Sequence, residues 1–310
     1  MNAFPKVTII MATYNRAHFI VETLQTIKNQ SFTYWECLII DDGGSDNTID
    51  VITPIMEQDN RFQFLKRPAS YKKGLSGCRN YGLDLAKGDC VIFFDDDDIV
   101  HPDNLKTSIE VIEKNNVDFC NYQKMSFVDE RPAIKRVSVV IEKYLSREEI
   151  EKVAAQKIGL ASCTVLWKRQ CFNQIRFNES LLYAEEWECY TRIISENFKG
   201  IIINNVLYYN RKHPDSNTGK FFRNNAVCRE SFTQAILLVV RNLKEKQLLS
   251  TSLIRYFVTI SKDFAKYNLY ENIIIILDLP TFEKLKWQLF YFTLPLRISV
   301  YKLKKAFKKI

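Results

Sequence analysis

Residues 90–98, which read CVIFFDDDD, constrain this chain most, because five strand-forming residues run directly into four consecutive acids. A segment rich in Val, Ile and Phe favours a strand buried inside a sheet. An acidic run usually lies on a solvated surface, but this one follows a predicted core strand. Ligands bind at the strand ends of open α/β sheets, and clustered carboxylates suit Mn²⁺ or Mg²⁺, which commonly hold substrate phosphates. The segment therefore predicts a divalent-metal site that binds a phosphorylated ligand.

Alternating strand and helix patterns fill the first 120 residues. Buried strands are predicted at 7–11, 36–40, 62–65, 90–94 and 117–122. Between these strands, apolar residues at helical spacing predict helices from residue 17 onward, up to residue 56, over 74–88 and over 102–114, and Pro102 is expected as the first residue of the last of these helices. This alternation predicts an α/β fold with a mostly parallel, Rossmann-like sheet flanked by helices.

Polar residues follow the first, second and fourth predicted strands. Because the ends of such strands converge on one edge of the sheet, we expect the active site to combine residues 13–16, 41–44 and 95–98. Further along, strands are predicted at 160–166 and 201–209, with a helix entered within 178–192. After about residue 220 glycine disappears and long helical patterns take over, so a C-terminal α-helical extension is expected.

The overall composition limits the class of protein. With 46% hydrophobic residues in 310, the chain can form a large core, and its net charge of +8 suits a protein that meets polyanions. The eight cysteines form no Cys-x-x-Cys pair, which favours buried, reduced thiols in a cytosolic protein. No basic-then-apolar leader and no apolar run of about 18 residues is seen, so a cytoplasmic location is expected.

Four motifs stand in order along the chain: ATYNR at 12–16, DDGGSD at 41–46, GCRNYG at 77–82 and FDDDD at 94–98. Together they resemble the family 2 glycosyltransferases with the GT-A fold, of the bacterial surface-polysaccharide type, over residues 5–215. The resemblance implies an inverting transfer reaction, a nucleotide-diphosphate sugar donor, and Mn²⁺ or Mg²⁺ as cofactor. It also favours UDP over GDP.

The resemblance carries over to donor-binding residues. It places Ala12 and Tyr14 against the nucleotide base, and it implies that Asp42 accepts a hydrogen bond from the base. Arg16 belongs to the first of these motifs and is also expected at the donor. For Arg79, contact with the donor phosphates and an ordinary surface position remain equal alternatives.

The metal and the ribose are assigned to the acidic run. The family's Asp-x-Asp motif maps to Asp95 and Asp97, with Asp96 at the variable middle position of the donor site, and the metal is expected mainly at Asp97. His213 resembles a histidine that approaches the diphosphate or metal in the family's Tyr-Arg-x-His loop. In YNRKH at 209–213, one extra residue separates the Tyr from the Arg.

The family's catalytic base lies in a Glu-Asp pair that opens a helix. Here the pair is Glu185-Glu186, and Arg192 follows Glu186 by six residues, as the family spaces it. Glu186 therefore stands where Asp is usual, and it is the candidate base for the acceptor hydroxyl. Glu185 could instead be a helix N-terminal charge, and Trp187 is either a core residue or an acceptor platform. A base opposite a leaving group predicts single displacement with inversion.

The C-terminal tail combines apolar residues at helical spacing with six basic residues. Leu296, Val300, Leu303, Phe307 and Ile310 form one face; Arg297, Lys302, Lys304, Lys305, Lys308 and Lys309 cover the rest. Such a basic amphipathic helix suits an anionic membrane surface, although docking on the protein is the alternative. A peripheral enzyme on the inner face of the plasma membrane, with a glycan or polyprenyl-linked acceptor, is therefore expected. The helical segment could also pair two subunits in a homodimer.

These features divide the chain into residues 1–219, a GT-A catalytic domain, and residues 220–310, a helical region with a basic tail. Within the first, 1–125 is expected to bind the nucleotide sugar and 126–219 the acceptor. Two other classes remain open. A nucleotidyltransferase usually has a glycine-rich loop after the first strand, which 12–16 lacks; a non-catalytic sugar-nucleotide or membrane-binding protein would fit a lost base at Glu186. Nucleic acid is not an expected partner, because the basic residues form one terminal patch.

Overall fold

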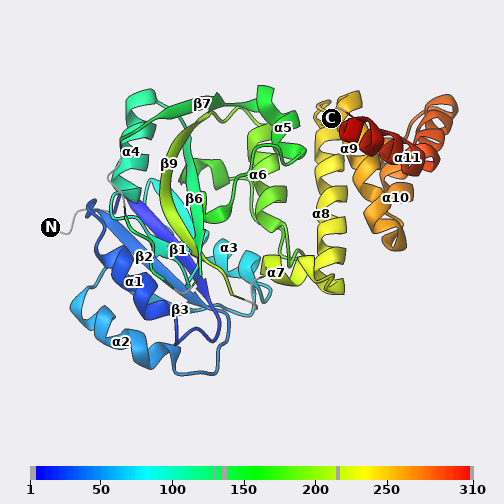
Figure 1. The fold of residues 1–310 in the computed structure, drawn as a ribbon. Helices are drawn as coiled ribbons and strands as arrows, with labels where there is room; N and C mark the ends of the chain where they lie inside the picture. The colour runs from blue at the N-terminus through cyan, green and yellow to red at the C-terminus, as the bar shows by residue number, and fades with distance from the viewer. Residues whose placement is uncertain (1–4, 129, 135–137, 214–216, 308–310) are drawn as a thin grey trace.

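A single mixed sheet of nine strands, with helices on both faces, forms the body of the molecule in this computed structural model (Figure 1). The structure describes residues 5–128, 130–134, 138–213 and 217–307; for residues 217 and 298–307 it describes the backbone only. The strands are β1 (Val7–Thr13), β2 (Trp35–Asp41), β3 (Phe62–Lys66), β4 (Cys90–Phe94), β5 (Ile99–Val100), β6 (Phe119–Phe127), β7 (Ile141–Leu145), β8 (Val165–Lys168) and β9 (Gly200–Arg211). The α-helices are α1 (Ile20–Lys28), α2 (Thr48–Gln58), α3 (Leu75–Leu85), α4 (Asn104–Asn115), α5 (Ile150–Ala154), α6 (Glu185–Ser195), α7 (Asn217–Phe222), α8 (Ala226–Glu245), α9 (Thr251–Ile260), α10 (Leu269–Leu277) and α11 (Thr281–Phe307).

The sheet has the order β3-β2-β1-β4-β8-β6-β9-β5, and β7 pairs with β9. Strands β3, β2, β1 and β4 are parallel, whereas β8 runs antiparallel to both of its neighbours, β4 and β6. The chain order reverses at β1, which lies between β2 and β4, and ligands bind at such switch points. The predicted α/β class, with a mostly parallel sheet and helices after it, is confirmed.

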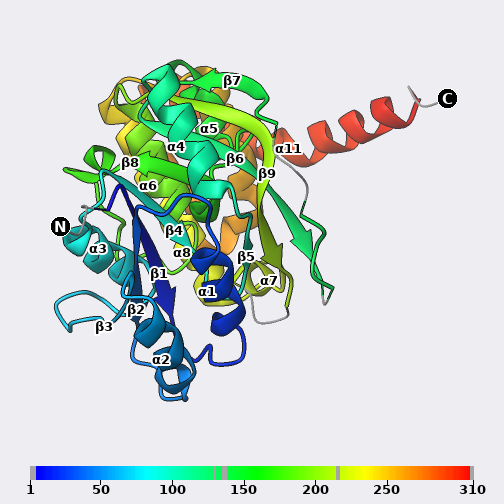
Figure 2. The ribbon, with the colours of Figure 1, turned by 90° about the vertical axis from the view of Figure 1, so that its left-hand side faces the viewer.

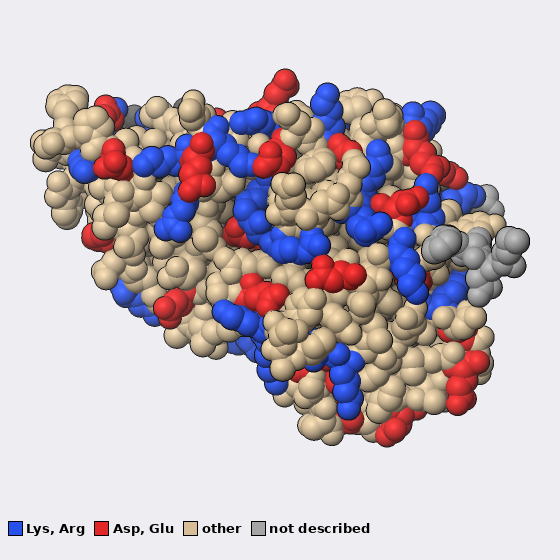
Figure 3. Space-filling model, turned by 180° about the vertical axis from the view of Figure 1, so that it is seen from behind, with Lys and Arg blue, Asp and Glu red and all other residues tan. Residues whose placement is uncertain are grey.

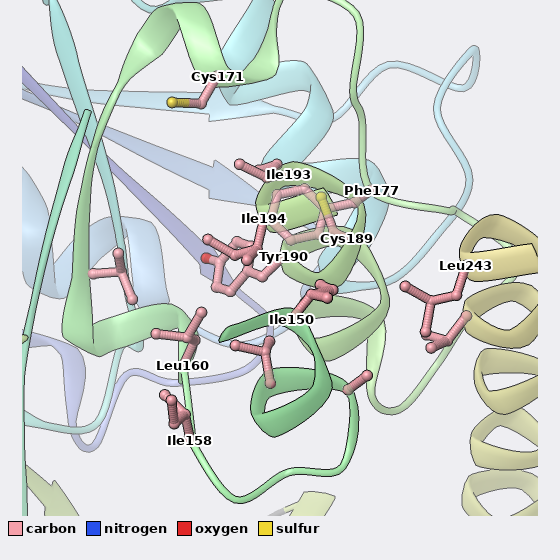
Figure 4. Close-up of a cluster of buried hydrophobic side chains, with 14 of the residues drawn as sticks. Ile150, Ile158, Leu160, Cys171, Phe177, Cys189, Tyr190, Ile193, Ile194 and Leu243 are labelled. Atoms are coloured by element: carbon pink, nitrogen blue, oxygen red, sulfur yellow. The ribbon is translucent and has the colours of Figure 1, made fainter. Parts of the chain in front are cut away.

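Each face of the sheet has its own hydrophobic core, because successive side chains of a strand point to opposite faces. On one face Ile9, Ile92 and Phe94 pack with residues of α1, α2 and α4. On the other face Ile10 and Phe93 pack with residues of α5, α6 and α8. Figure 4 shows part of this second core, where the α6 residues lie beside residues of α5 and the segment before β8.

Gly82 allows α3 to lie close to the sheet, and Gly77 allows it to lie close to the loop that precedes it. A Cβ at Gly82 would come within 2.5 Å of Cγ2 of Ile10 in β1, and one at Gly77 within 1.9 Å of the carbonyl oxygen of Lys72. The close packing places the residues between these glycines, including Arg79, over the carboxyl ends of the strands.

Helix α8 joins the sheet and its flanking helices to the helices that follow it. Val239, Val240 and Leu243 of α8 belong to the same core as the α6 residues, and Figure 1 shows α8 standing between α6 and α9–α11. Beyond them, Trp287 and Tyr291 of α11 pack on Tyr270 of α10. Within the described residues, no helix combines the length and hydropathy needed to cross a bilayer.

Three local predictions are wrong. Pro102 does not open α4, which begins at Asn104, because residues 101–103 form a loop in which the N–H of Asp103 donates to Nδ1 of His101. The strand expected at 160–166 begins only at Val165, after a 3₁₀ turn at Ser162–Thr164. The strand expected at 117–122 begins at Phe119 and continues to Phe127, since it pairs along β9. The buried thiols are confirmed: all eight cysteines are buried and none is in a disulfide.

Candidate active site

The loops after β1 and β2 are tied together at the carboxyl edge of the sheet. Asn15 adopts a left-handed conformation with φ of 54°, and its side-chain oxygen accepts hydrogen bonds from the N–H groups of Ser45 (2.8 Å) and Asp46 (3.2 Å). The N–H of Gly44 donates to Oδ1 of Asp41 at 2.9 Å. These bonds fix the backbone of both predicted donor-binding loops beside the switch point.

The four acids after β4 have different surroundings. Asp96 and Asp98 are buried, and the side chain of Asp97 is only 12% exposed, whereas that of Asp95 is 42% exposed. The guanidinium of Arg16 lies 3.2 Å from Oδ1 of Asp96 and 3.8 Å from Oδ2 of Asp97. Arg16 therefore belongs to this acidic cluster and brings the first motif to the fourth.

Burial and mutual repulsion disfavour the charged forms of these acids. Burial raises the pKa of Asp96 to about 7, with Arg16 opposing the shift and Asp97 adding to it. Burial, followed by the charges of Asp95 and Asp97, raises the pKa of Asp98 well above its ordinary value. An added cation would relieve this repulsion.

His213, two residues after the end of β9, contacts the acidic run. Its Nε2 lies 2.9 Å from Oδ2 of Asp97. Arg211 ties the same segment down: its N–H donates to Oδ1 of Asp98 at 2.7 Å, and its Nε donates to the carbonyl oxygen of Asp97 at 3.0 Å. The extra residue in this loop thus does not prevent the histidine from reaching the acids.

Asp97 and His213 offer a carboxylate oxygen and an imidazole nitrogen to a metal ion. Within the described part of the chain, no three His, Cys, Asp or Glu side chains are grouped closely enough to hold a metal alone, so Asp95 does not complete such a group. Mn²⁺ and Mg²⁺ often take only one or two protein ligands, with substrate phosphates and water supplying the others. The two groups and the electrostatics of the cluster fit that kind of site.

Asp42 lies at the end of β2, and protein donors surround its carboxylate. It accepts hydrogen bonds from Nε of Arg67 at 2.6 Å and from the N–H of Gly74 at 3.0 Å, and Sγ of Cys78 lies 3.6 Å away. The turn before Ser45 is held by Asp41, not by Asp42. The observed role of Asp42 is to join β2 to α3, and its contact with a base stays a prediction.

Ala12 lies near the end of β1 and Tyr14 directly after that strand, and the two residues differ in exposure. Tyr14 is 47% exposed, with Nζ of Lys73 4.4 Å from the centre of its ring, so one aromatic face is available for stacking. Ala12 packs on the small cluster formed by Leu38, Ile40 and Cys78. Their contact with a nucleotide base stays a prediction.

Arg79 is not a surface cation, because it is only 4% exposed. Its guanidinium lies 2.7 Å from Oε1 of Glu185, 3.2 Å from the hydroxyl of Ser162, and 4.0 Å from Oδ1 of Asp95. Arg79 on α3 thus joins the acidic end of β4 to the first turn of α6. Glu185 is buried in this ion pair.

Glu186, next to this ion pair, is half-buried, and none of the described salt bridges includes it. Burial, then the charge of Glu185, raises its pKa to about 8, while Arg79 opposes the shift. Ala184, which precedes the pair, has a φ of 63°, so the chain turns sharply as it enters α6. A carboxyl group with a pKa near neutrality is suited to accept a proton in catalysis.

Glu186 lines a cavity of about 280 Å³. The cavity lies between α6, α8 and the segment before β8, and Tyr183, Trp187 and Phe232 contribute aromatic walls. The indole N–H of Trp187 donates to the carbonyl oxygen of Val153 at 3.3 Å, which fixes the ring. Trp187 therefore belongs to both the core and the cavity wall.

A second cavity of about 450 Å³, which includes Lys6 and Asp89, lies at the opposite edge of the sheet and contains none of the predicted site residues.

Several site residues escaped sequence reasoning. The hydroxyl of Tyr208 accepts from the N–H of Asp95 at 3.1 Å, and Arg67 holds Asp42. Glu188 is buried and pairs with Arg192, so this arginine supports α6 without a described bond to Glu186. The run Tyr209-Asn210-Arg211 at the end of β9 lies next to Tyr208 but does not include it, and nothing local marks Arg67.

The fold and this edge define a class of protein. An open α/β sheet with an acidic run after β4, next to the switch point, faces a helix that begins with paired glutamates. This is the arrangement of a sugar-nucleotide-dependent transferase with the GT-A fold.

The chain belongs to glycosyl transferase family 2, whose sequence model matches residues 8–175, and it is a glycosyltransferase. The Escherichia coli protein named UDP-Glc:alpha-D-GlcNAc-diphosphoundecaprenol beta-1,3-glucosyltransferase WfgD is 28% identical over 194 residues, which cover 62% of this chain and 70% of that protein. The structure of Staphylococcus aureus TarS 1–349 in complex with UDP-GlcNAc superposes with a TM-score of 0.64 at 19% identity, covering 91% of this chain and 78% of that one. The mannosyltransferase PcManGT of Pyrobaculum calidifontis, solved with GDP-Man and Mn²⁺, gives a TM-score of 0.53 at 14% identity and covers 89% and 86%.

Proposed function

We propose that this family 2 enzyme moves a sugar from a UDP-sugar to a hydroxyl group of a glycan or polyprenyl-linked acceptor, with inversion and with a divalent metal. The arrangement around Arg79 is the observation that carries the proposal. It holds the acids after β4 on one side and the glutamate pair of α6 on the other. Residues 1–125 would bind the donor, 126–219 the acceptor, and 220–310 would form an accessory helical region.

The donor would lie over the loops after β1, β2 and β4. Asp97 and His213 would hold Mn²⁺ or Mg²⁺, which when bound supplies a Lewis acid for the departing diphosphate. Tyr14 offers its exposed ring face to the base. Arg16, already at the acidic cluster, would balance the charge of the diphosphate next to Asp96.

Glu186 would act on the acceptor. As the acceptor oxygen forms its bond to the anomeric carbon, Glu186 takes the proton of that hydroxyl group. The bond between the anomeric carbon and the diphosphate oxygen breaks on the opposite side, and the nucleotide diphosphate leaves with the electron pair. Because attack and departure are on opposite faces, the configuration inverts. Positioning by Arg79 and Glu185 would hold the base at the required distance from the donor.

The choice of donor and acceptor draws support from the relatives. TarS is solved with UDP-GlcNAc, and the name of WfgD gives UDP-Glc as donor and a sugar on diphosphoundecaprenol as acceptor. A UDP-sugar and a lipid-linked acceptor of surface-polysaccharide assembly are the substrates these names favour.

Thermal-shift screening of nucleotide sugars, with Mn²⁺ and with EDTA, tests the donor side. We expect a UDP-sugar to raise the melting temperature only in the presence of the metal, and slow release of UDP to follow. The Asp97→Asn variant should lose the metal-dependent shift, whereas Asp50→Asn, at an exposed acid of α2, should keep it. Equal stabilisation in EDTA would refute the proposed role of the acids.

Helix α11 supplies the feature that supports a membrane location. Five apolar residues at alternating spacings of three and four form one face and are each 59–78% exposed: Phe282, Leu285, Leu289, Phe292 and Leu296. The opposite face packs on the protein through Trp287, Tyr291 and Leu294. Figure 2 shows the C-terminal part of α11 projecting from the body, and Figure 3 shows the end of the molecule formed by these helices, at the left, as mostly uncharged.

We propose that this face of α11 rests on an anionic membrane surface, so that the enzyme is peripheral to the inner face of the plasma membrane. The basic side chains after Arg297, and Val300, Leu303, Phe307 and Ile310 with them, lie outside the described side chains. Burial of one large apolar side chain contributes about 1.5–3 kcal/mol, so loss of two should weaken binding strongly.

Liposome flotation with the full-length protein tests this location. Leu289→Gln/Phe292→Gln should release the protein from anionic vesicles, while the matched pair Tyr34→Gln/Ile49→Gln, on exposed apolar residues of the catalytic part, should not. If instead the α11 variant changes a dimer into a monomer in light scattering and flotation is absent for all forms, the face pairs two subunits and the membrane proposal fails.

A further inference from the structure

A lysine-lined cavity of about 330 Å³ lies beside β6 and β7. Lys124 of β6, Lys143 of β7 and Lys157 line it, and Glu142 is the one acid among its described lining residues. The floor is polar and fixed, because the hydroxyl of Thr164 donates to the side-chain oxygen of Asn121 at 3.0 Å. A cavity with a surplus of two positive charges favours an anionic ligand.

This lysine cavity adjoins the cavity of Glu186. Ile158, Gly159 and Ala161 line both, so one short segment forms the wall that they share. Gln156, which lines the Glu186 cavity at the start of this segment, has a φ of 55°. A molecule with a sugar in one cavity could therefore place a neighbouring group in the other.

Lys124 connects the lysine cavity to the catalytic groups electrostatically. Partial removal from water lowers the pKa of Lys124, but nearby groups, among them the carboxylates of Asp95, Glu186 and Asp98, raise it, and the net shift is upward. Its ammonium group therefore keeps its charge in the lysine cavity.

The positions of Lys143 and Lys157 favour a ligand group on the acceptor over one on the donor. They lie on β7 and on the segment after α5, elements that contribute no residue to the acidic cluster. The donor diphosphate already has Arg16 and the acids after β4 at the switch point. A second anion site beside Glu186 is not needed by the donor.

We propose that the lysine cavity binds the phosphate or diphosphate group through which the acceptor carries its sugar, while that sugar reaches Glu186 through the adjoining cavity. The inference rests on the proposed transferase function and adds to it the residues that select a phosphorylated acceptor. An acceptor with the same sugar on a neutral aglycone would lack this contact.

Binding of inorganic pyrophosphate to the full-length protein in EDTA is the first test. Without metal the donor site is not expected to hold a diphosphate, so calorimetry should report the lysine cavity. Each charge-assisted contact is worth about tenfold in affinity, so Lys143→Gln/Lys157→Gln should weaken binding by about 100-fold. The matched pair Lys106→Gln/Lys114→Gln, on exposed positions of α4, should bind as the wild type does. Equal binding by all three proteins overturns the proposal.

Kinetics with two acceptors separate a lipid-linked phosphate from free phosphate. An alkyl diphosphate ester of N-acetylglucosamine is compared with the neutral alkyl glycoside of the same sugar. Lys143→Gln/Lys157→Gln should raise KM for the ester by at least about tenfold and leave KM for the glycoside unchanged. Loss of pyrophosphate binding with no change in either KM would make the cavity a free-anion site and overturn the acceptor assignment. UDP binding by the wild type with Mn²⁺ tests the proposed function separately, so the two failures are distinguishable.

Discussion

Glu185 and Glu186 are adjacent in sequence, yet their surroundings predict opposite effects of the same substitution. Glu185 is buried in an ion pair with Arg79 at 2.7 Å. Glu186 faces a cavity, lies in no described salt bridge, and has a pKa of about 8. Replacing each in turn by glutamine removes one charge with little change in volume, so the pair forms its own matched control.

Glu185→Gln should destabilise the protein. Removing one partner of a buried ion pair typically costs about 3–5 kcal/mol. Glutamine keeps a hydrogen-bond acceptor for Arg79, and Asp95 remains 4.0 Å from the guanidinium, so we expect a smaller loss. A loss of about 2 kcal/mol corresponds to a fall in Tm of about 3 °C in a chain of this size. Transfer should survive at reduced rate, because Glu186 is still present.

Glu186→Gln should have the opposite effects: it should abolish most activity and raise stability. Loss of a general base lowers kcat by about 100- to 10,000-fold. Stability should rise, and more so at high pH. In the unfolded chain the Glu186 carboxyl group loses its proton near pH 4.5, whereas in the folded chain it keeps the proton until about pH 8. The wild type therefore loses stability as the pH rises from 4.5 to 8. The glutamine variant has no such proton, and its advantage in Tm should be larger at pH 8.5 than at pH 5.

Differential scanning fluorimetry at these two pH values and UDP release with Mn²⁺ measure both effects. The reasoning is refuted if Glu186→Gln melts lower than Glu185→Gln at pH 8.5, or if Glu186→Gln retains transfer while Glu185→Gln abolishes it. Either result would give the base role to the other carboxylate or remove both from it.

Three further predictions concern the base, the metal and the fold. In the wild type, kcat/KM should rise with pH to a plateau above about 8 as Glu186 loses its proton; a profile flat from pH 6 to 9 contradicts this. Asp97→Asn and His213→Ala should each raise the Mn²⁺ concentration for half-maximal activity by about tenfold or more, equivalent to ~1.4 kcal/mol, as a Mn²⁺ titration would measure. Gly82→Ala should destabilise the protein by about 1–3 kcal/mol because the new Cβ meets Cγ2 of Ile10 at 2.5 Å; an unchanged Tm would show that α3 can shift without cost.

The first half of the fold could be predicted from sequence because its signals are local. Apolar runs of strand length and the polar residues that end them gave β1, β2 and β4, and parallel strands bring their ends to one edge. The antiparallel insertion of β8 between β4 and β6 has no such local signal. Its partner choice depends on packing across both faces of the sheet.

Long-range pairs in the site were not predictable. Arg79 and Glu185 are separated by 106 residues, and either side chain alone is compatible with an exposed position. The lysine cavity likewise combines residues from β6, β7 and the segment after α5, whose charges are unremarkable in sequence. Only the fold shows that these groups face the same space.

The packing of the C-terminal helices could not be predicted from the sequence. The change of composition near residue 220 is real, but Val239, Val240 and Leu243 of α8 complete the core that also holds α6. Since α6 carries the glutamate pair, a change in α8 can reach the site through packing. Sequence composition shows that the residue types change at such a position, but it does not show which surface the following segment covers.

Arg79 connects the two chemical halves of the site. The acids after β4 and the glutamates of α6 are all negative, so without a cation between them the two groups would repel each other. The guanidinium of Arg79 lies 4.0 Å from Asp95 and 2.7 Å from Glu185. The ring centres of Phe93 and Phe177 lie 5.8 and 5.3 Å from its central carbon. A buried, paired arginine has little freedom to move, so it sets the separation between the acids after β4 and the glutamate pair of α6. This spacing depends in turn on α3, because Gly82 lets that helix approach β1.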